Sequence, residues 1–145
     1  MSDAGPVRTR PEPTTIVLFA CVHNAGRSQI AAGWLNALAS PDRARALSAG
    51  TRPADRVNPV VVEAMREAGI DVSGAIPRRL TTELAAAAQW LITMGCGDDC
   101  PVVAGVERDD WPIEDPAGQS IERVRAIRDD IRARVERFLD RERLR

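Results

Sequence analysis

The chain has 145 residues, of which 44% are hydrophobic and 28% charged, and this is the size and balance of one globular domain rather than a disordered chain. Its 20 basic and 21 acidic residues leave a net charge of -1, and only 3% of the residues are aromatic, so a basic or base-stacking nucleic-acid binder is not expected. All basic residues are arginine, so an anion site would use guanidinium or backbone N–H groups.

The N-terminal end of the sequence differs in character from the rest. Residues 1–13 carry three prolines and few apolar side chains, which predicts a disordered tail before a single domain over residues 14–145. No apolar run is long enough to span a membrane, and no apolar signal core is present. Three cysteines form an odd set without a secretory signal, which indicates reduced thiols and a cytoplasmic location.

The first half of the chain alternates between strand and helix patterns. Thr14–Ala20 is β-branched or apolar throughout, which is typical of a strand buried on both faces of a parallel sheet. Ser28 is suited to cap the helix that follows. Ala44–Ala49 is a second candidate strand, and Asn58-Pro59 is a good start for a helix that Gly69 would end.

The second half continues the alternation. We expect a short helix over residues 81–88 and a third buried strand over Gln89–Met94. Gly95–Pro101 is then a loop that holds two of the cysteines, and Val106–Trp111 contains a fourth short candidate strand. From Gln119 onward, apolar residues recur at helical spacing among arginines and acids, which predicts a long amphipathic C-terminal helix with a solvated charged face.

Strands that alternate with helices predict an α/β fold with βαβ units and a parallel sheet. Ligands bind such sheets beyond the carboxyl ends of the strands. Three segments leave those ends, namely Cys21–Ser28, Gly95–Cys100 and Trp111–Gly118, and the first two contain every cysteine of the chain. We therefore expect the functional site at this edge of the sheet.

A candidate oxyanion loop follows the first strand. Its members are Cys21, Val22, His23, Asn24, Ala25, Gly26, Arg27 and Ser28. Backbone N–H groups of such a loop can converge on a tetrahedral anion at the positive end of the next helix, and Arg27 can clamp two oxygens. The same field stabilises a thiolate nucleophile on Cys21, with Ser28 donating to the sulfur. The simpler alternatives are a buried cysteine beside a surface arginine, and a solvated His23 without a chemical role.

The segment VLFACVHNAGRSQIAAGW resembles the start of the low-molecular-weight protein tyrosine phosphatase family, and more narrowly its arsenate reductase branch. Phosphatases of this fold usually have proline after the serine, whereas Gln29 follows Ser28 here. The resemblance runs from about Thr14 to Leu139 and includes LSAGT, ITMGCGDDCP and WPIEDPAG. It implies a three-layer fold in which helices flank a four-stranded parallel sheet.

The resemblance places Asp115 where the family keeps its general acid, with Glu114 as a neighbouring competitor. A carboxyl group over the anion pocket can protonate a departing oxygen. Taken alone, Asp115-Pro116 is as well explained as a turn initiator. Phosphatases usually follow this pair with a tyrosine that lines the phosphotyrosine pocket, but Ala117 and Gly118 follow here and the chain has no tyrosine.

The resemblance also implies a thiol relay. Cys21 attacks arsenate and expels water or hydroxide, and Cys96 then attacks the sulfur of the adduct, which releases arsenite and leaves a Cys21–Cys96 disulfide. Cys100 attacks Cys96 and frees Cys21, so that an outside reductant meets a Cys96–Cys100 disulfide. A structural zinc half-site is the alternative for Cys96 and Cys100, but it lacks further ligands.

No bound cofactor and no metal are expected; the reductant is external. A thioredoxin-like dithiol protein is one candidate. Because the C-x3-C spacing is shorter than in the best-known thioredoxin-coupled members, glutathione or mycothiol with a glutaredoxin-like protein is another. Arsenate is the expected substrate, with phosphate or sulfate as mimics. The runner-up function is a protein tyrosine or small phosphoester phosphatase, and a non-enzymatic oxyanion sensor is the third.

Overall fold

The computed structural model describes residues 13–145, so the tail predicted over residues 1–13 lies, apart from Pro13, outside the described residues. Within that range, four strands form one parallel sheet in the order β2-β1-β3-β4. The strands are β1 (Thr15–Cys21), β2 (Ala44–Gly50), β3 (Trp90–Thr93) and β4 (Glu107–Asp110). The α/β fold with a four-stranded parallel sheet is therefore confirmed.

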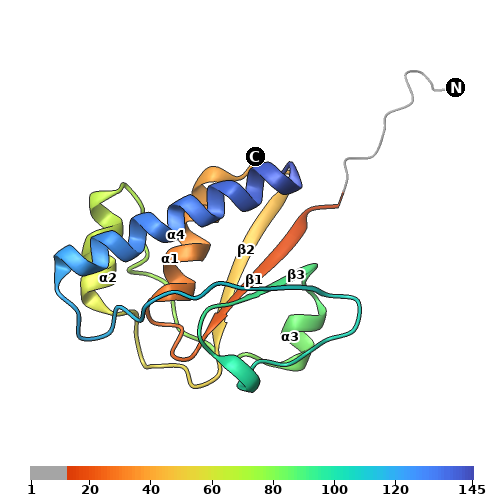
Figure 1. Cartoon of the computed structure of the whole chain (residues 1–145), viewed down its shortest axis with the longest axis horizontal. Helices are drawn as coiled ribbons and strands as arrows, with labels where there is room; N and C mark the ends of the chain where they lie inside the picture. The colour runs from red at the N-terminus through yellow and green to blue at the C-terminus, as the bar shows by residue number, and fades with distance from the viewer. Residues whose placement is uncertain (1–12) are drawn as a thin grey trace, which may run out of the picture.

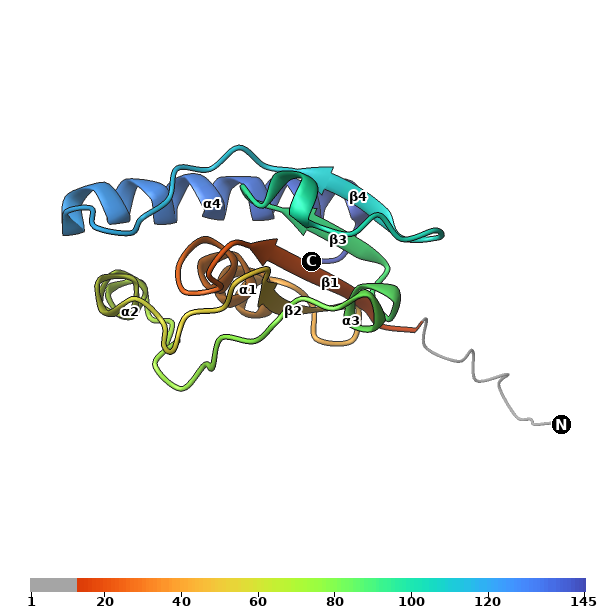
Figure 2. The ribbon, with the colours of Figure 1, turned by 90° about the horizontal axis from the view of Figure 1, so that it is seen from below.

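Helices cover both faces of this sheet (Figures 1 and 2). One face carries α1 (Arg27–Leu38) and α4 (Ile121–Glu142), and α2 (Pro59–Glu67) packs beside α4. The other face carries the short α3 (Thr82–Ala86) and the 3-10 turn η1 (Gly97–Asp99). The three-layer arrangement places the loops that follow β1, β3 and β4 at one end of the molecule, as expected for carboxyl ends of parallel strands.

The central strand β1 divides the interior into two apolar clusters. Val17 and Phe19 point into the larger core under α1 and α4, whereas Leu18 and Ala20 point into the smaller core beneath α3. All four residues are fully buried. The continuous apolar run thus predicted a strand buried on both faces, because period-2 side chains of a central strand meet a helical layer on each side.

Short sequence patterns correctly predicted where α2 begins and ends. Asn58 caps α2 by accepting from the Val60 N–H, with proline at the first helical position, and Gly69 follows the helix with a φ of 83°. The cap predicted for α1 is wrong. Gly26, not Ser28, occupies that position without a side-chain cap, because the Ser28 hydroxyl bonds to Cys21 instead.

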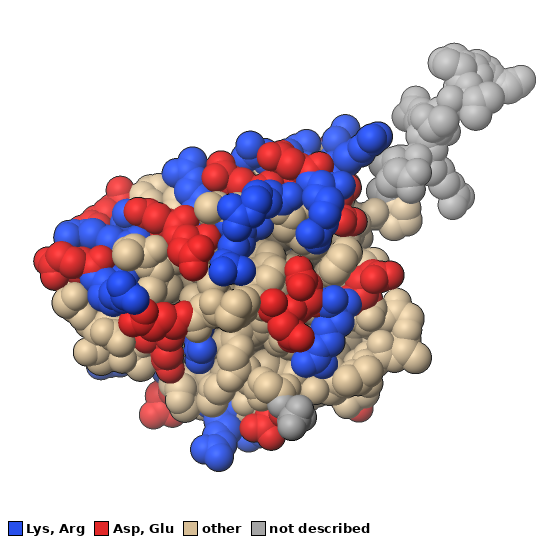
Figure 3. All heavy atoms as spheres, in the orientation of Figure 1, with Lys and Arg blue, Asp and Glu red and all other residues tan. Residues whose placement is uncertain are grey.

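The C-terminal helix α4 has the predicted buried stripe. Its apolar side chains at Val124, Ile127, Ile131, Val135 and Leu139 are buried, and Phe138 joins them in an edge-to-face contact with Trp90 at 5.2 Å. On the face seen in Figure 3, arginine and acidic side chains are interspersed rather than gathered by sign. Ion pairs such as Arg125–Glu67 tie α4 to α2. Among the described residues, no helix has the length and apolar character needed to cross a membrane.

Candidate active site

A pocket of about 320 Å³ opens at the carboxyl end of β1. It is lined by Cys21, His23, Ala25, Gly26, Arg27, Ala54, Asn58, Asp115, Pro116 and Ala117. A larger hollow of about 810 Å³ lies between α1, β2 and residues 69–78, but neither a cysteine nor a histidine lines it. The smaller pocket joins a thiol, a guanidinium and a carboxyl group, so it is the candidate active site.

Hydrogen bonds from a neighbouring segment fix the backbone of the oxyanion loop, residues 21–28. The carbonyl oxygens of Cys21, Val22, His23 and Ala25 accept hydrogen bonds from N–H groups of the segment 51–58. Among the described residues, the N–H groups of Val22 through Gly26 meet no acceptor. Because these four carbonyl oxygens are bonded to a neighbouring segment, the loop's N–H groups are left for an anion, which is the arrangement that an oxyanion cradle requires.

A chain of hydrogen bonds leads to the Cys21 sulfur. The Arg78 N–H donates to Asn24 Oδ1 at 3.0 Å, and Asn24 Nδ2 donates to Ser28 Oγ at 2.7 Å. Ser28 Oγ lies 3.0 Å from Cys21 Sγ. Because the serine oxygen already accepts from Asn24, its own proton is left for a hydrogen bond to the sulfur.

Asn24 is the central member of this chain, Gln29 supports its backbone, and both residues are buried. Asn24 adopts the left-handed backbone conformation, with a φ of 52°, which asparagine tolerates better than most residues. Gln29 Nε2 donates to the Asn24 carbonyl at 3.0 Å. The sequence placed Asn24 in the loop but did not reveal that its side chain would organise Ser28.

Arg27 is buried, at 8% exposure, and reaches across to the loop that follows β4. Its Nη1 donates to the Ile113 carbonyl at 3.2 Å, and its Nη2 lies 3.6 Å from Asp115 Oδ2. Asp115 Oδ1 accepts from the Ala117 N–H at 3.0 Å, so this residue also initiates a turn. The Asp115 side chain is 46% exposed over the mouth of the pocket, where it can exchange protons with solvent.

Glu114, the competing carboxyl group, points elsewhere. Both of its oxygens accept from Arg123 Nε, at 2.9 and 3.0 Å. These hydrogen bonds from the guanidinium lower the pKa of Glu114 below its ordinary value. A carboxylate held ionised by a partner on α4 is a poor proton donor, which leaves Asp115 as the carboxyl group over the pocket.

The other loop residues have plainer surroundings. His23 is exposed at the pocket rim, with Nδ1 3.2 Å from the Arg52 carbonyl oxygen. No group of three or more metal-ligating side chains is assembled in the part of the chain that the structure describes.

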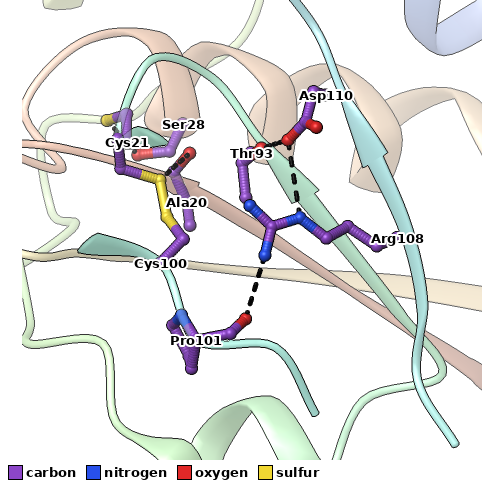
Figure 4. Close-up of a disulfide and its surroundings, with 9 residues drawn as sticks. Ala20, Cys21, Ser28, Thr93, Cys100, Pro101, Arg108 and Asp110 are labelled. Carbon is purple, nitrogen blue, oxygen red and sulfur yellow. Dashed lines mark hydrogen bonds and ion pairs between the residues drawn. A yellow bond between two sulfur atoms is a disulfide. The ribbon is translucent and has the colours of Figure 1, made fainter. Parts of the chain in front are cut away.

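The three cysteines divide between the two apolar clusters that β1 separates. Figure 4 shows Cys21 and the disulfide partner Cys100 near Ala20. Cys21 is a buried free thiol in the larger core, whereas Cys96 and Cys100 form a disulfide in the smaller core, with their Cα atoms 5.8 Å apart. The Cys96 sulfur lies 3.9 Å from the carbonyl oxygen of Ala20, the residue before Cys21. The structure thus brings Cys21, Arg27, Ser28 and Asp115 together, and places the disulfide close to them but outside their pocket.

Gly95 is the functional position that the sequence analysis missed. It begins the segment Gly95–Pro101, here called the redox loop, and has a φ of 101°. A Cβ atom on Gly95 would collide with the Arg27 guanidinium. Glycine therefore meets two requirements here, a left-handed backbone and a close approach of the Arg27 guanidinium. The only local signal for it is a glycine directly after the predicted strand Gln89–Met94.

We expect Gly95→Ala to weaken inorganic phosphate binding about tenfold, because displaced Arg27 loses part of its clamp. Backbone strain should also lower the free energy of unfolding by about 1 to 3 kcal/mol. Titration calorimetry and chemical denaturation measure the two effects. Gly97→Ala is the matched control, since Gly97 also has a positive φ, 56°, but nothing lies within 4 Å of its Cβ position. Equal loss of phosphate binding in both variants would contradict the contact with Arg27.

Comparisons with known proteins show the family of this chain. The low molecular weight phosphotyrosine protein phosphatase family matches residues 16–145, and the chain belongs to that family. A Halobacterium salinarum protein named "Putative arsenate reductase" is 40% identical over 137 residues, which cover 89% of this chain and 94% of the relative.

Solved structures of arsenate reductases are also similar to this chain. A thioredoxin-dependent arsenate reductase of Corynebacterium glutamicum is similar with a TM-score of 0.77 and 38% identity; the match covers 90% of this chain but spans only 63% of that one. A structure described as an arsenate reductase in the phosphate binding state has a TM-score of 0.79 and 32% identity, and covers 88% of this chain and 98% of its own.

Proposed function

We propose that this protein is an arsenate reductase that converts arsenate to arsenite through a relay of Cys21, Cys96 and Cys100. The observation that carries the proposal is the Cys96–Cys100 disulfide packed against the strand that ends in the free thiol Cys21. A phosphatase needs one thiol, but a reductase must supply two electrons, and two thiols that become a disulfide supply them. Similarity to arsenate reductases supports this choice over a phosphatase.

In the first step, arsenate lies in the loop with its oxygens on the backbone N–H groups and the Arg27 guanidinium. The Cys21 thiolate attacks arsenic while an As–O bond breaks, and Asp115 gives its proton to the departing oxygen, which leaves as water. The Ser28 hydroxyl steadies the thiolate before the attack. Arsenic remains As(V) in this adduct, so no electrons have yet moved.

In the second step, the Cys96 thiolate attacks Cys21 Sγ. The S–As bond breaks with its electron pair on arsenic, so arsenic becomes As(III) and leaves as arsenite, while the two sulfurs are oxidised to a disulfide. Cys100 then attacks Cys96 Sγ and releases Cys21 as a thiolate. The pairing of Cys96 with Cys100 beside a free Cys21 supports this order, since it is the state expected at the end of the cycle.

The disulfide must finally be reduced from outside. A thioredoxin-like dithiol protein is the reductant that we propose, in the cytoplasm, and the thioredoxin-dependent neighbour from Corynebacterium glutamicum supports it. Glutathione or mycothiol with a glutaredoxin-like protein is the alternative.

Arsenite formation tests the function directly. Arsenate is offered with thioredoxin and its reductase, with glutathione and glutaredoxin, and with mycothiol and mycoredoxin in separate reactions. We expect continuous arsenite release with thioredoxin. Absence of arsenite in all three would refute the function, whereas release with another donor alone would change only the reductant. The value of kcat/KM for an aryl phosphate should lie below that for arsenate, because no tyrosine lines the pocket.

Asp115→Asn should lower the rate of Cys21–arsenic adduct formation about 100- to 1,000-fold, because the amide has no proton to give to the leaving oxygen. Rapid-quench mass spectrometry follows the adduct. Glu114→Gln is the control and should change this rate little, since Glu114 is occupied by Arg123. An equal loss of rate in the two variants would show that a changed loop conformation, and not the missing Asp115 proton, causes the loss.

A further inference from the structure

The disulfide is closed to an outside thiol as it stands. Cys96 is 5% and Cys100 4% exposed, and both pack in the smaller core with residues such as Leu18 and Leu91. Thiol–disulfide exchange requires a thiolate to approach one sulfur from outside the S–S bond. The redox loop must therefore lift away from the sheet before a protein dithiol can reach it.

The C-terminal end of the redox loop is hydrogen-bonded to the edge strand β4. Arg108 Nη1 donates to the carbonyl oxygen of Pro101, the last residue of the loop, at 3.1 Å. Figure 4 shows the guanidinium between β4 and this carbonyl. Arg108 lies opposite Leu91 in the β3–β4 register, on the sheet face that carries the redox loop. Its side chain is partly shielded, at 28% exposure, which strengthens a hydrogen bond from a charged donor.

Two neighbours orient this arginine. Arg108 Nε lies 3.6 Å from Asp110 Oδ1, and Asp110 follows two residues later on the same face of β4. Thr93 on β3 donates its hydroxyl to the same carboxylate oxygen. Neither the disulfide nor the anion pocket needs Arg108 for its own chemistry, yet the side chain connects a fixed strand to the segment that must move.

We propose that Arg108 is a latch, a positioning residue that holds the redox loop closed over the Cys96–Cys100 disulfide and sets how often that loop opens to a dithiol reductant. The inference rests on the proposed function, because a reductase must renew this disulfide in every cycle. In the open state a reductant thiolate attacks one sulfur and breaks the S–S bond. The reductant's second thiol then resolves the mixed disulfide, so two electrons pass to Cys96 and Cys100, which take up two protons.

The test uses the full-length oxidised protein without arsenate. Reduced thioredoxin is added, and alkylation followed by mass spectrometry counts the thiols freed on Cys96 and Cys100. Arg108→Met keeps the apolar stem but removes every donor, and it should accelerate reduction about tenfold, the worth of one charge-assisted hydrogen bond. Arg108→Lys retains a charged donor and should stay within about threefold of the wild-type rate.

Arg45→Met is the matched control, because Arg45 is an exposed arginine on β2 at the opposite edge of the sheet. It should leave the reduction rate unchanged. An unchanged rate in Arg108→Met would overturn the latch, as would a similar rise in Arg45→Met. Arg108→Lys that behaves like Arg108→Met would also overturn it, because a retained donor would then have no effect.

The assay separates this inference from the proposed function. Arsenite release by the wild type is measured in a second reaction. If Arg108→Met is reduced faster but the wild type releases no arsenite, the latch is supported and the proposed function is refuted. If the wild type releases arsenite but Arg108→Met is reduced at the wild-type rate, the function is supported and the latch is refuted.

Discussion

Replacing Cys21 with serine should abolish arsenite release, with kcat/KM reduced by about 10,000-fold or more. A serine hydroxyl is not ionised near neutral pH in this loop, and an oxygen at this position cannot pair with Cys96 to supply electrons. Cys21 is 2% exposed and contacts Ser28, so the smaller hydroxyl should fit without loss of the fold. Arsenite is measured under multiple turnover with thioredoxin.

Phosphate binding is the control for Cys21→Ser. The variant keeps Arg27 and the loop N–H groups, so its affinity for phosphate should match that of the wild type within a few fold. Arsenite release at the wild-type rate would remove Cys21 from the reaction. If the variant loses both phosphate binding and arsenite release, the loop has collapsed, and the result says nothing about the nucleophile.

Cys96→Ser and Cys100→Ser should stop the cycle at different points. Without Cys96 the Cys21–arsenic adduct forms but no arsenite leaves, so mass spectrometry should find arsenic bound to Cys21. Without Cys100 the protein should release about one arsenite per chain and then remain as a Cys21–Cys96 disulfide. In both variants multiple turnover with thioredoxin should fall to background.

The contrast between these variants tests the order of the relay. Steady turnover in Cys96→Ser would exclude Cys96 as the thiol that attacks Cys21. Continued turnover in Cys100→Ser with glutathione, but not with thioredoxin, would show that a small thiol can replace Cys100. Both serine variants remove the disulfide, so their unfolding should be compared with that of the reduced wild type.

The amino-acid order was sufficient for features whose cause is local. The unbroken apolar run predicted β1, Asn58-Pro59 predicted the start of α2, and the helical spacing of apolar residues predicted the buried stripe of α4. Parallel strands place their carboxyl ends at one edge, so the cysteine loops could be assigned to the same end of the molecule.

Features that join distant residues appeared only in three dimensions. The sequence predicted that Ser28 donates to the Cys21 sulfur, and the fold has that contact, but the bond from the Asn24 side chain to the same hydroxyl had no signal in the sequence. The resemblance favoured Asp115 over its neighbour Glu114, and the fold adds the physical reason, because Arg123 on α4 binds the Glu114 carboxylate.

The contact of Gly95 with Arg27 and the bond from Arg108 to Pro101 likewise had no signal in the spacing of residues. Backbone hydrogen bonding and hydrophobic periodicity act over a few residues, so the order of amino acids carries them. Hydrogen bonds between side chains from different loops depend on the path of the chain between them, and only the packed fold determines that path.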